Sequence, residues 1–173
     1  MNKKGISVVV GYVLLITFGI MISVLVYAYL KTFVPSDTPA CPDGVSIYLK
    51  DYSYNCSSGE LNLTLKNNGK FKINGYFAHG TTNPNVTLAT EDLSNNFNYI
   101  MSGDGVVLSG VMYFHTNTTI PLNFGEESIQ SFNLVNRTYT LEIIPIRFQT
   151  ENNVEKFTSC GNAKIIQTLE CSG

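Results

Sequence analysis

The stretch that decides the fold is residues 5–30, GISVVVGYVLLITFGIMISVLVYAYL, which contains no Asp, Glu, Lys or Arg. A helix rises about 1.5 Å per residue, so these 26 residues span roughly 39 Å. That length exceeds the ~30 Å hydrocarbon core of a bilayer. It also exceeds the apolar core of a signal peptide, and Tyr27-Ala28-Tyr29 is a poor cleavage site. We therefore expect a retained hydrophobic helix over residues 6–34, after a basic leader at residues 1–5.

The charges around this helix predict its orientation. Lys3 and Lys4 precede it, and basic residues flanking a membrane helix favour the cytoplasmic side. We expect a single-pass membrane protein in which everything after Lys31 lies outside the cell. The net charge is −2 and there is no basic run beyond Lys3-Lys4, so we expect no nucleic-acid partner.

Small residues recur along the helix at a spacing of four. Ser7, Gly11, Gly19 and Ser23 follow this spacing, with Leu15 between the two pairs. Residues at i and i+4 lie on the same side of a helix, and small side chains there let a second helix approach closely. The spacing predicts helix–helix packing through these four positions.

The residues around the leader give a more specific indication. Lys3-Lys4-Gly5-Ile6-Ser7-Val8-Val9-Val10-Gly11 resembles the start of archaeal type IV pilins, although Val8 replaces the usual Pro and Val10 replaces the Glu of many bacterial pilins. The resemblance implies that a prepilin peptidase recognises Lys3, Lys4, Gly5 and Ile6 and cuts the Gly5–Ile6 bond. It also implies pilus assembly machinery as a partner, and a cell-surface filament of copies or related pilins joined through the helix.

The remainder of the chain has the pattern of a β domain. Three prolines within residues 35–43 predict a stiff linker, and residues 44–173 then change to alternating apolar and polar positions. Pro145 predicts an edge position or a bulge in its strand. The expected strands are Val45–Leu49, Leu61–Leu65, Phe71–His79, Val106–Phe114, Ser128–Leu134, Thr138–Phe148, Val154–Thr158 and Ala163–Leu169.

Two local motifs refine the fold class. Leu61–Gly69 resembles the strand and Asn-Gly corner of immunoglobulin-like adhesion and CARDB-type domains, and Pro121–Ser128 resembles the turn before a later strand of such domains. The predicted fold is an all-β immunoglobulin-like sandwich preceded by one long N-terminal hydrophobic α-helix.

The four cysteines all follow the hydrophobic helix, which indicates two disulfides and an oxidising compartment. Extended strands separate Cys41 from Cys56, and Cys160 from Cys171, too far for local bridges. Two pairings remain. Antiparallel end segments give Cys41–Cys171 with Cys56–Cys160, and parallel ones give Cys41–Cys160 with Cys56–Cys171. The spacings do not decide between these sets, and we favour the antiparallel one.

Modification and chemistry complete the expectations. Five Asn-x-Ser/Thr sequons mark possible N-glycosylation, at Asn55, Asn62, Asn85, Asn117 and Asn136. We find no phosphate loop, zinc-protease motif or nucleophile elbow, so we expect neither an enzyme nor a cofactor or metal.

The expected function is a structural subunit, major or minor, of a type IV pilus-like filament. The alternative is a monomeric, membrane-anchored surface domain for adhesion or ligand binding.

Overall fold

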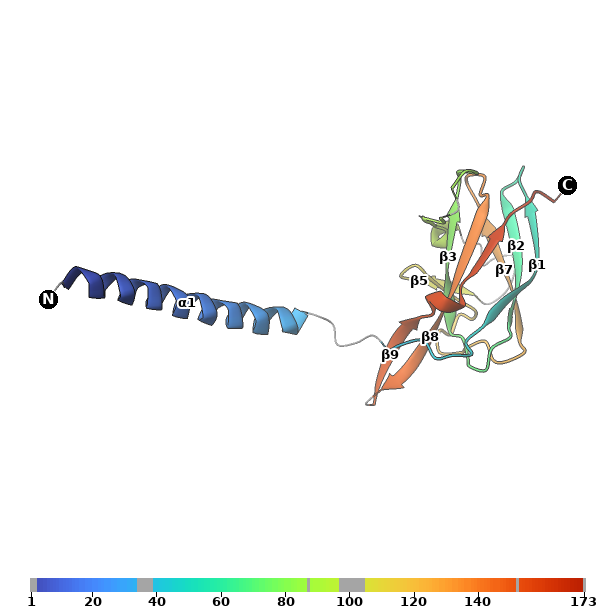
Figure 1. The fold of residues 1–173 in the computed structure, drawn as a ribbon. Coiled ribbons are helices and arrows are strands. Elements are labelled where there is room, and N and C mark those ends of the chain that lie inside the picture. The colour runs from blue at the N-terminus through green and yellow to red at the C-terminus, as the bar shows by residue number, and fades with distance from the viewer. Residues whose placement is uncertain (1–2, 34–38, 87, 97–104, 152, 173) are drawn as a thin grey trace. The chain divides into compact units, whose positions relative to one another are not determined.

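The computed structural model describes residues 3–33, 39–86, 88–96, 105–151 and 153–172, which form two compact units (Figure 1). The first unit, Met1–Thr38, contains the helix α1. The second unit, Pro39–Gly173, contains all of the described β-strands and is called the head below.

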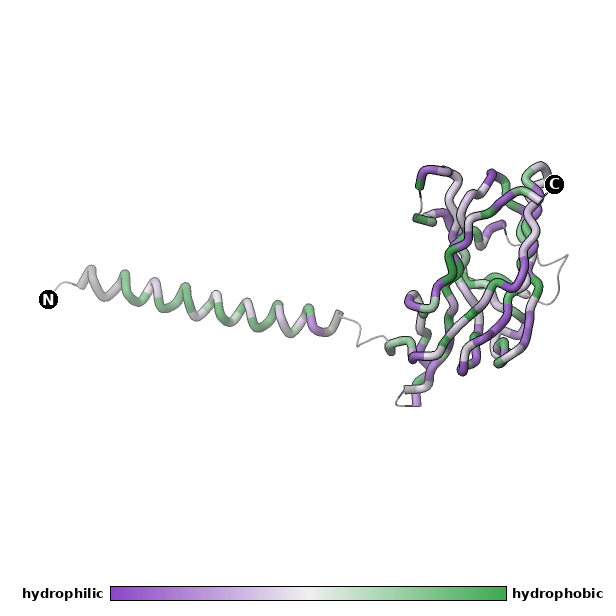
Figure 2. Tube along the Cα trace, turned by 45° about the vertical axis from the view of Figure 1, so that its right-hand side comes forward, coloured by the Kyte–Doolittle hydropathy of each residue, from purple (hydrophilic) through white to green (hydrophobic). Residues whose placement is uncertain are grey.

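The helix α1 extends over Lys3–Phe33, 31 residues, which confirms the predicted N-terminal apolar helix. Its large apolar side chains between Val8 and Leu30 are 49–71% exposed. Figure 2 shows apolar positions along the coloured part of the helix, without a continuous polar side. A helix that is apolar all round needs an apolar environment, either a membrane or other helices.

The head is an all-β unit of two antiparallel sheets. The first sheet has the order β1-β2-β7, and the second has the order β10-β8-β3-β6-β5, with β4 added to β3 and β9 added to β8. The first-sheet strands are β1 (Ile47–Asn55), β2 (Glu60–Asn67) and β7 (Glu127–Asn133). The second-sheet strands are β3 (Gly75–Thr81), β4 (Glu91–Asp92), β5 (Val106–Leu108), β6 (Val111–Tyr113), β8 (Thr140–Glu151), β9 (Val154–Ser159) and β10 (Ile165–Thr168). Two short 3-10 turns, η1 (Ser94–Asn96) and η2 (Gly161–Ala163), complete the elements.

The two sheets share one hydrophobic core. Leu61, Leu63 and Leu65 on β2 are fully buried, as the alternation in the sequence predicts. They belong to the same cluster as Tyr76 from β3 and Ile143 from β8, in the other sheet. Burying an aliphatic side chain stabilises a fold by roughly 1.5–3 kcal/mol, so this shared core holds the two sheets together.

A bulge changes the phase of the first strand. The pairing of β1 with β2 shifts between Leu49 and Asp51. Ile47 is therefore buried before the shift and Tyr54 after it, although Tyr54 lies an odd number of positions along the chain from Ile47. One extra residue in a strand has this effect because side chains alternate between the faces with a period of two.

Pro145 is predicted at an edge or at a bulge, but it lies in an interior strand whose pairing with β3 continues through it without a register shift. It pairs with Tyr76 of β3 on one side of β8. On the other side, β10 covers β8 up to Ile143, and β9 covers it from Ile146 onward. The Pro145 carbonyl accepts the Cys160 N–H at 2.9 Å, so the prolyl nitrogen faces the interval between β9 and β10. A residue without an N–H fits there because no ladder bond is interrupted.

The predicted strand Val106–Phe114 is two strands. β5 and β6 form a hairpin closed by Ser109 and Gly110, whose φ angles are 52° and 79°. Two central residues with positive φ are the requirement of the tight turn that suits the twist of a β-hairpin. The apolar residues on both sides of this turn gave the appearance of one continuous strand.

The connection between β2 and β3 is fixed by a buried amide. Asn67 is fully buried, and its Nδ2 donates to the carbonyl oxygens of Phe71 at 2.9 Å and Leu122 at 2.8 Å. Its Oδ1 accepts the Gly69 N–H at 3.0 Å. These bonds join the end of β2 to the segment before β7, and they set the position of the following residues, 70–74.

Candidate functional site

The small residues of α1 leave open places on its surface. A Cβ built at Gly11 or Gly19 would meet no atom within 4 Å, apart from the helix's own nearby backbone and adjoining residues. Ser7 with Gly11, and Gly19 with Ser23, are two pairs of small residues at i and i+4. A row of this kind is inclined to the helix axis, and such pairs favour a helix pair that crosses at about −40°.

Two aliphatic hydroxyl groups on α1, those of Thr17 and Ser23, are hydrogen-bonded within the helix. Ser23 Oγ donates to the Gly19 carbonyl at 2.8 Å, and Thr17 Oγ1 donates to the Leu14 carbonyl at 2.9 Å. Ser23 therefore presents a small side chain to a second helix. Its hydroxyl proton is already donated to the Gly19 carbonyl and is not available to that helix. Ser7 lies in the helical backbone, with its side chain outside the described part of the chain.

The predicted leader residues lie at the beginning of α1. The helical backbone includes Lys3, Lys4, Gly5 and Ile6, whereas residues 1–2 lie outside the described residues. At the other end, residue 34, the last of the predicted helix, and residues 35–38 of the predicted linker also lie outside them. Residues 39–43 belong to the head.

The head contains two disulfides, as predicted, but the favoured pairing is wrong. Cys41 bonds Cys160 and Cys56 bonds Cys171, with Cα–Cα distances of 5.2 and 5.4 Å. The antiparallel set fails because the segments around β1 and β10 run in the same direction. These strands are the outer strands of different sheets, so they are not required to alternate in direction as hydrogen-bonded neighbours of one antiparallel sheet are.

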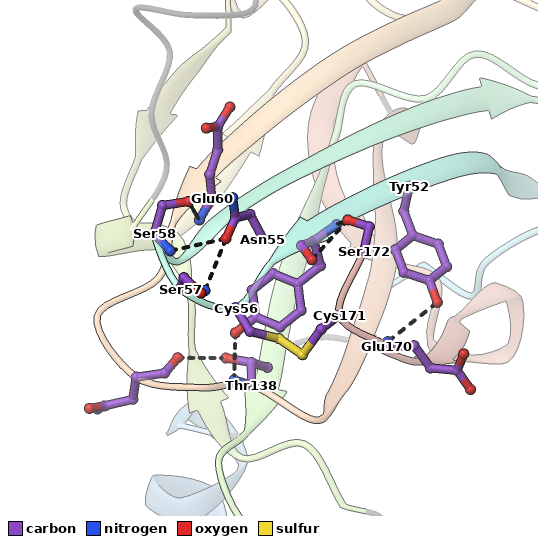
Figure 3. The surroundings of a disulfide bond; sticks show 12 residues. Tyr52, Asn55, Cys56, Ser57, Ser58, Glu60, Thr138, Glu170, Cys171 and Ser172 are labelled. Atoms are coloured by element: carbon purple, nitrogen blue, oxygen red, sulfur yellow. Dashed lines mark hydrogen bonds between the residues drawn. A yellow bond between two sulfur atoms is a disulfide. The ribbon is translucent and has the colours of Figure 1, made fainter.

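Figure 3 shows how the C-terminal segment continues this parallel course beside β1. The Glu170 N–H donates to the Tyr52 hydroxyl at 3.4 Å, and the Ser172 N–H donates to the Tyr54 carbonyl at 2.8 Å. The Ser172 hydroxyl also donates to that carbonyl at 2.9 Å and accepts the Tyr54 N–H at 3.0 Å. The last residues of the described chain therefore close the edge of the first sheet beside the Cys56–Cys171 bridge.

The five sequons differ in the accessibility of their asparagines. Asn85, Asn117 and Asn136 are exposed and lie in loops, although Thr87 of the first sequon lies outside the described residues. Asn55 is exposed but accepts two backbone N–H groups beside the Cys56 disulfide. Asn62 is half-buried in the middle of β2, where it bonds Glu60 and Ser131. Access to a modifying enzyme is thus greatest at the three loop positions.

A carboxylate on the outer side of the first sheet bridges two lysines. Glu127 accepts from Lys50 Nζ at 2.7 Å and from Lys66 Nζ at 3.1 Å. These hydrogen bonds hold the pKa of Glu127 below its ordinary value of 4.5. The three residues come from β1, β2 and β7, so this exposed group crosses the whole first sheet.

The sequence reasoning missed a cation-lined hollow in the head. The hollow has a volume of about 380 Å³ and is lined by Lys70, Lys72 and Arg147, among other residues. Its residues come from separate parts of the chain, so no local motif marks it. One signal was available, because Arg147 is the only charged residue between Glu142 and Glu151 in an apolar strand.

The fold and these sites define a two-part class of protein, in which an apolar helix of membrane-spanning length precedes an all-β head with two disulfides. Comparison with protein-family models, with curated proteins and with solved structures found no match.

Proposed function

We propose that this chain is a structural subunit of a type IV pilus-like surface filament. The helix first anchors the chain in the membrane as a single span, with the head outside. A prepilin peptidase then cuts the Gly5–Ile6 bond, and the freed helix packs against the helices of other copies or related pilins. In this proposal the head forms the filament surface and has no catalytic role.

The observation that supports this proposal is the surface of α1. The segment Val8–Lys31 is 24 residues long, apolar and unburied, and it is long enough to cross a membrane. The helix that contains this segment has two pairs of small residues that suit close helix packing. A simple anchor requires only the apolar length. The sequence Lys3-Lys4-Gly5 precedes the apolar segment. Cleavage after Gly5 removes both charged lysines, and the helix can then leave the membrane and enter a filament.

We propose further that the head is an immunoglobulin-like sandwich. The strand order supports this, because β1-β2-β7 corresponds to strands A, B and E of such folds, and β10-β8-β3 corresponds to G, F and C. The β4–β6 region then occupies the C′ side of the second sheet. An outside location agrees with the two disulfides, since disulfides persist in oxidising compartments.

The experiment is mass spectrometry of the mature N-terminus of the protein purified from membranes and from sheared surface filaments. We expect a chain that begins at Ile6 in the filament fraction, and Gly5→Leu should reduce that product. A chain that still begins at Met1, or one cut near Tyr29, would contradict the pilin proposal.

The second candidate is a monomeric, membrane-anchored head that binds a ligand, which the cation-lined hollow favours. In that case the full chain would remain in the membrane fraction and would be missing from sheared filaments. Crosslinking through a cysteine introduced at Gly19 separates the two candidates, because assembled helices yield dimers through that position and monomeric anchors do not.

A further inference from the structure

The cation-lined hollow combines three positive side chains from two parts of the head. Lys70 and Lys72 lie in the connection between β2 and β3, and Arg147 lies on β8. The hydrogen bonds of Asn67 fix the start of that connection. The Asn74 Oδ1, which accepts the Phe148 N–H at 2.9 Å, joins its end to β8. Hydrogen bonds therefore hold both ends of the connection that carries Lys70 and Lys72, and one of them joins it to β8, which carries Arg147.

The two arginines of the chain provide an internal comparison. Each guanidinium lies over an aromatic ring: Arg137 at 4.8 Å from the centre of Tyr139, and Arg147 at 4.6 Å from the centre of Phe71. Arg137 is exposed, whereas Nε and Nη1 of Arg147 are buried and have no hydrogen-bond partner among the described residues. Buried donors in folded proteins are nearly always paired, so Arg147 lacks an acceptor.

The charge at the hollow points to an anionic acceptor. Three cations and one carboxylate, Glu155, line it, in a chain whose net charge is −2. Within the described residues no salt bridge joins Glu155 to Arg147. Burial lowers the pKa of Arg147, which means that its surroundings disfavour the charged form. An arginine nevertheless remains protonated in proteins, so a bound anion would relieve an unfavourable state.

The size and the other lining groups indicate more than a single inorganic ion. At about 380 Å³ the hollow lies at the lower end of the volumes of small-molecule sites, roughly 300–1,000 Å³. Asn74 and Thr119 add an amide and a hydroxyl to its lining, and Phe148 adds an apolar surface. Sugars present this combination, because they have hydroxyl groups along their edges and C–H groups on their faces.

We propose that the hollow binds an acidic sugar, with its carboxylate or sulfate on Arg147 and its ring between the polar and apolar walls. The nitrogens of a guanidinium lie in one plane and direct their hydrogen bonds toward such a group, which a lysine does not do. Lys70 and Lys72 supply further positive charge at the opening. This proposal goes beyond the filament role, because it requires the head to face outside but does not require assembly.

The test is isothermal titration calorimetry on the full chain in detergent micelles. The ligands are galacturonate, galactose 6-sulfate, neutral galactose and inorganic sulfate. We expect both acidic sugars to bind, and galactose and inorganic sulfate to bind at least tenfold more weakly. Comparison of the two acidic sugars identifies which anionic group the site prefers. Equal binding of galactose and galacturonate would overturn the proposal, as would inorganic sulfate that binds as tightly as the acidic sugars.

Variants assign the binding to the residues. Arg147→Lys should weaken galacturonate binding at least tenfold, whereas the matched change Arg137→Lys should leave it unchanged. Glu155→Gln should tighten binding two- to fivefold, because it removes a competing carboxylate.

If Arg147→Lys does not fold, the double variant Lys70→Gln/Lys72→Gln changes only exposed side chains and should weaken binding at least fivefold. Equal effects of the two arginine changes, or none from the lysine pair, would contradict the proposed site. Because the assay requires neither leader cleavage nor filaments, its failure is distinct from failure of the pilin proposal.

Discussion

The helix and the head bury their apolar residues in opposite ways. In α1 the apolar side chains between Val8 and Leu30 are all at least 49% exposed, and the helix obtains its apolar surroundings from outside the chain. In the head, Leu61, Leu63 and Leu65 are fully buried by other residues of the same chain. The apolar surface of α1 is therefore covered only when the helix lies in a membrane or packs against other helices. The head, in contrast, has its own hydrophobic core and two disulfides.

This difference predicts where the chain tolerates substitution. In the helix one large apolar residue can replace another, and only the small residues have a positional requirement. In the head, each buried position has fixed neighbours, because protein interiors are close-packed. The predictions below test this contrast in decreasing order of their expected effect on the free energy of unfolding of the head.

Removal of the disulfides should have the largest effect. Each bridge closes a long loop, with sequence separations of 119 and 115 residues. Because both bridges join the same two end segments, either bridge closes an effective loop of only about 26 residues while the other is intact, and loop-closure entropy gives roughly 3–4 kcal/mol for such a loop. The double variants Cys41→Ala/Cys160→Ala and Cys56→Ala/Cys171→Ala should each lose about this much, measured by denaturant unfolding followed by near-ultraviolet circular dichroism. A loss below about 1 kcal/mol for either pair would show that the bridge does not constrain the unfolded chain as argued.

The same substitution in the two regions should give different results. Leu63→Ala removes buried methyl groups from the core of the head and should destabilise it by roughly 2–5 kcal/mol. Leu14→Ala, at a position that is 52% exposed in α1, should change the unfolding of the head by less than ~0.5 kcal/mol. Thermal melts of both variants in the same detergent test the contrast, which would be lost if Leu14→Ala destabilised the head comparably.

The pH dependence should be small, and the lowered pKa of Glu127 should account for part of it. Its pKa is lower in the folded protein than in the unfolded chain, because Lys50 and Lys66 hydrogen-bond the charged form. Its stabilising contribution is therefore complete above its ordinary value of 4.5 and is lost as the pH falls through the lowered folded value. Glu127→Gln should reduce the decline in melting temperature between pH 6 and pH 3. An unchanged decline in Glu127→Gln would contradict this role.

Changes in the small residues of the helix should leave the stability of the head unaltered. Gly11→Leu and Gly19→Leu have open space at the new Cβ, so membrane insertion and the melting temperature of the head should be preserved. Filament yield should fall strongly, as seen by electron microscopy of sheared fractions, because the leucines fill the surface that a second helix approaches. The controls Val13→Leu and Val24→Leu, on another side of the helix, should assemble normally. Normal filaments from the glycine variants would show that this row is not the packing surface.

The two regions also differed in how far they could be predicted from the sequence. The helix follows directly from 26 residues without a charge, because its environment is uniform and only length and composition matter. In the head, alternation located β2 correctly but only the beginning of β1, because the predicted strand Val45–Leu49 stops where the bulge changes the phase and β1 continues to Asn55. It failed for residues 106–114, where Ser109 and Gly110 reverse the chain between two apolar runs.

Neither the disulfide pairing nor the hollow could be predicted from the sequence. Both depend on how segments that are distant in the sequence are arranged in space. The spacing of Cys41 to Cys56, and of Cys160 to Cys171, is compatible with either direction of the end segments. Arg147 was visible as a charge in an apolar strand, but its unpaired state depends on Phe71 and on other residues far away in the sequence. Only the three-dimensional structure shows which way the end segments run and which residues surround Arg147.

The positions of the two bridges have a consequence for resistance to proteases. Both bridges join the part of the chain before Ser57 to the part after Ser159. A protease that cuts an exposed loop between those residues, for example beside Asn85, therefore produces two fragments that remain covalently joined at two points. The nicked head stays attached to its helix, and the distal fragment is released only after both disulfides are reduced. Cleavage of a single peptide bond in that span would therefore leave the chain covalently continuous from α1 to its C-terminal segment.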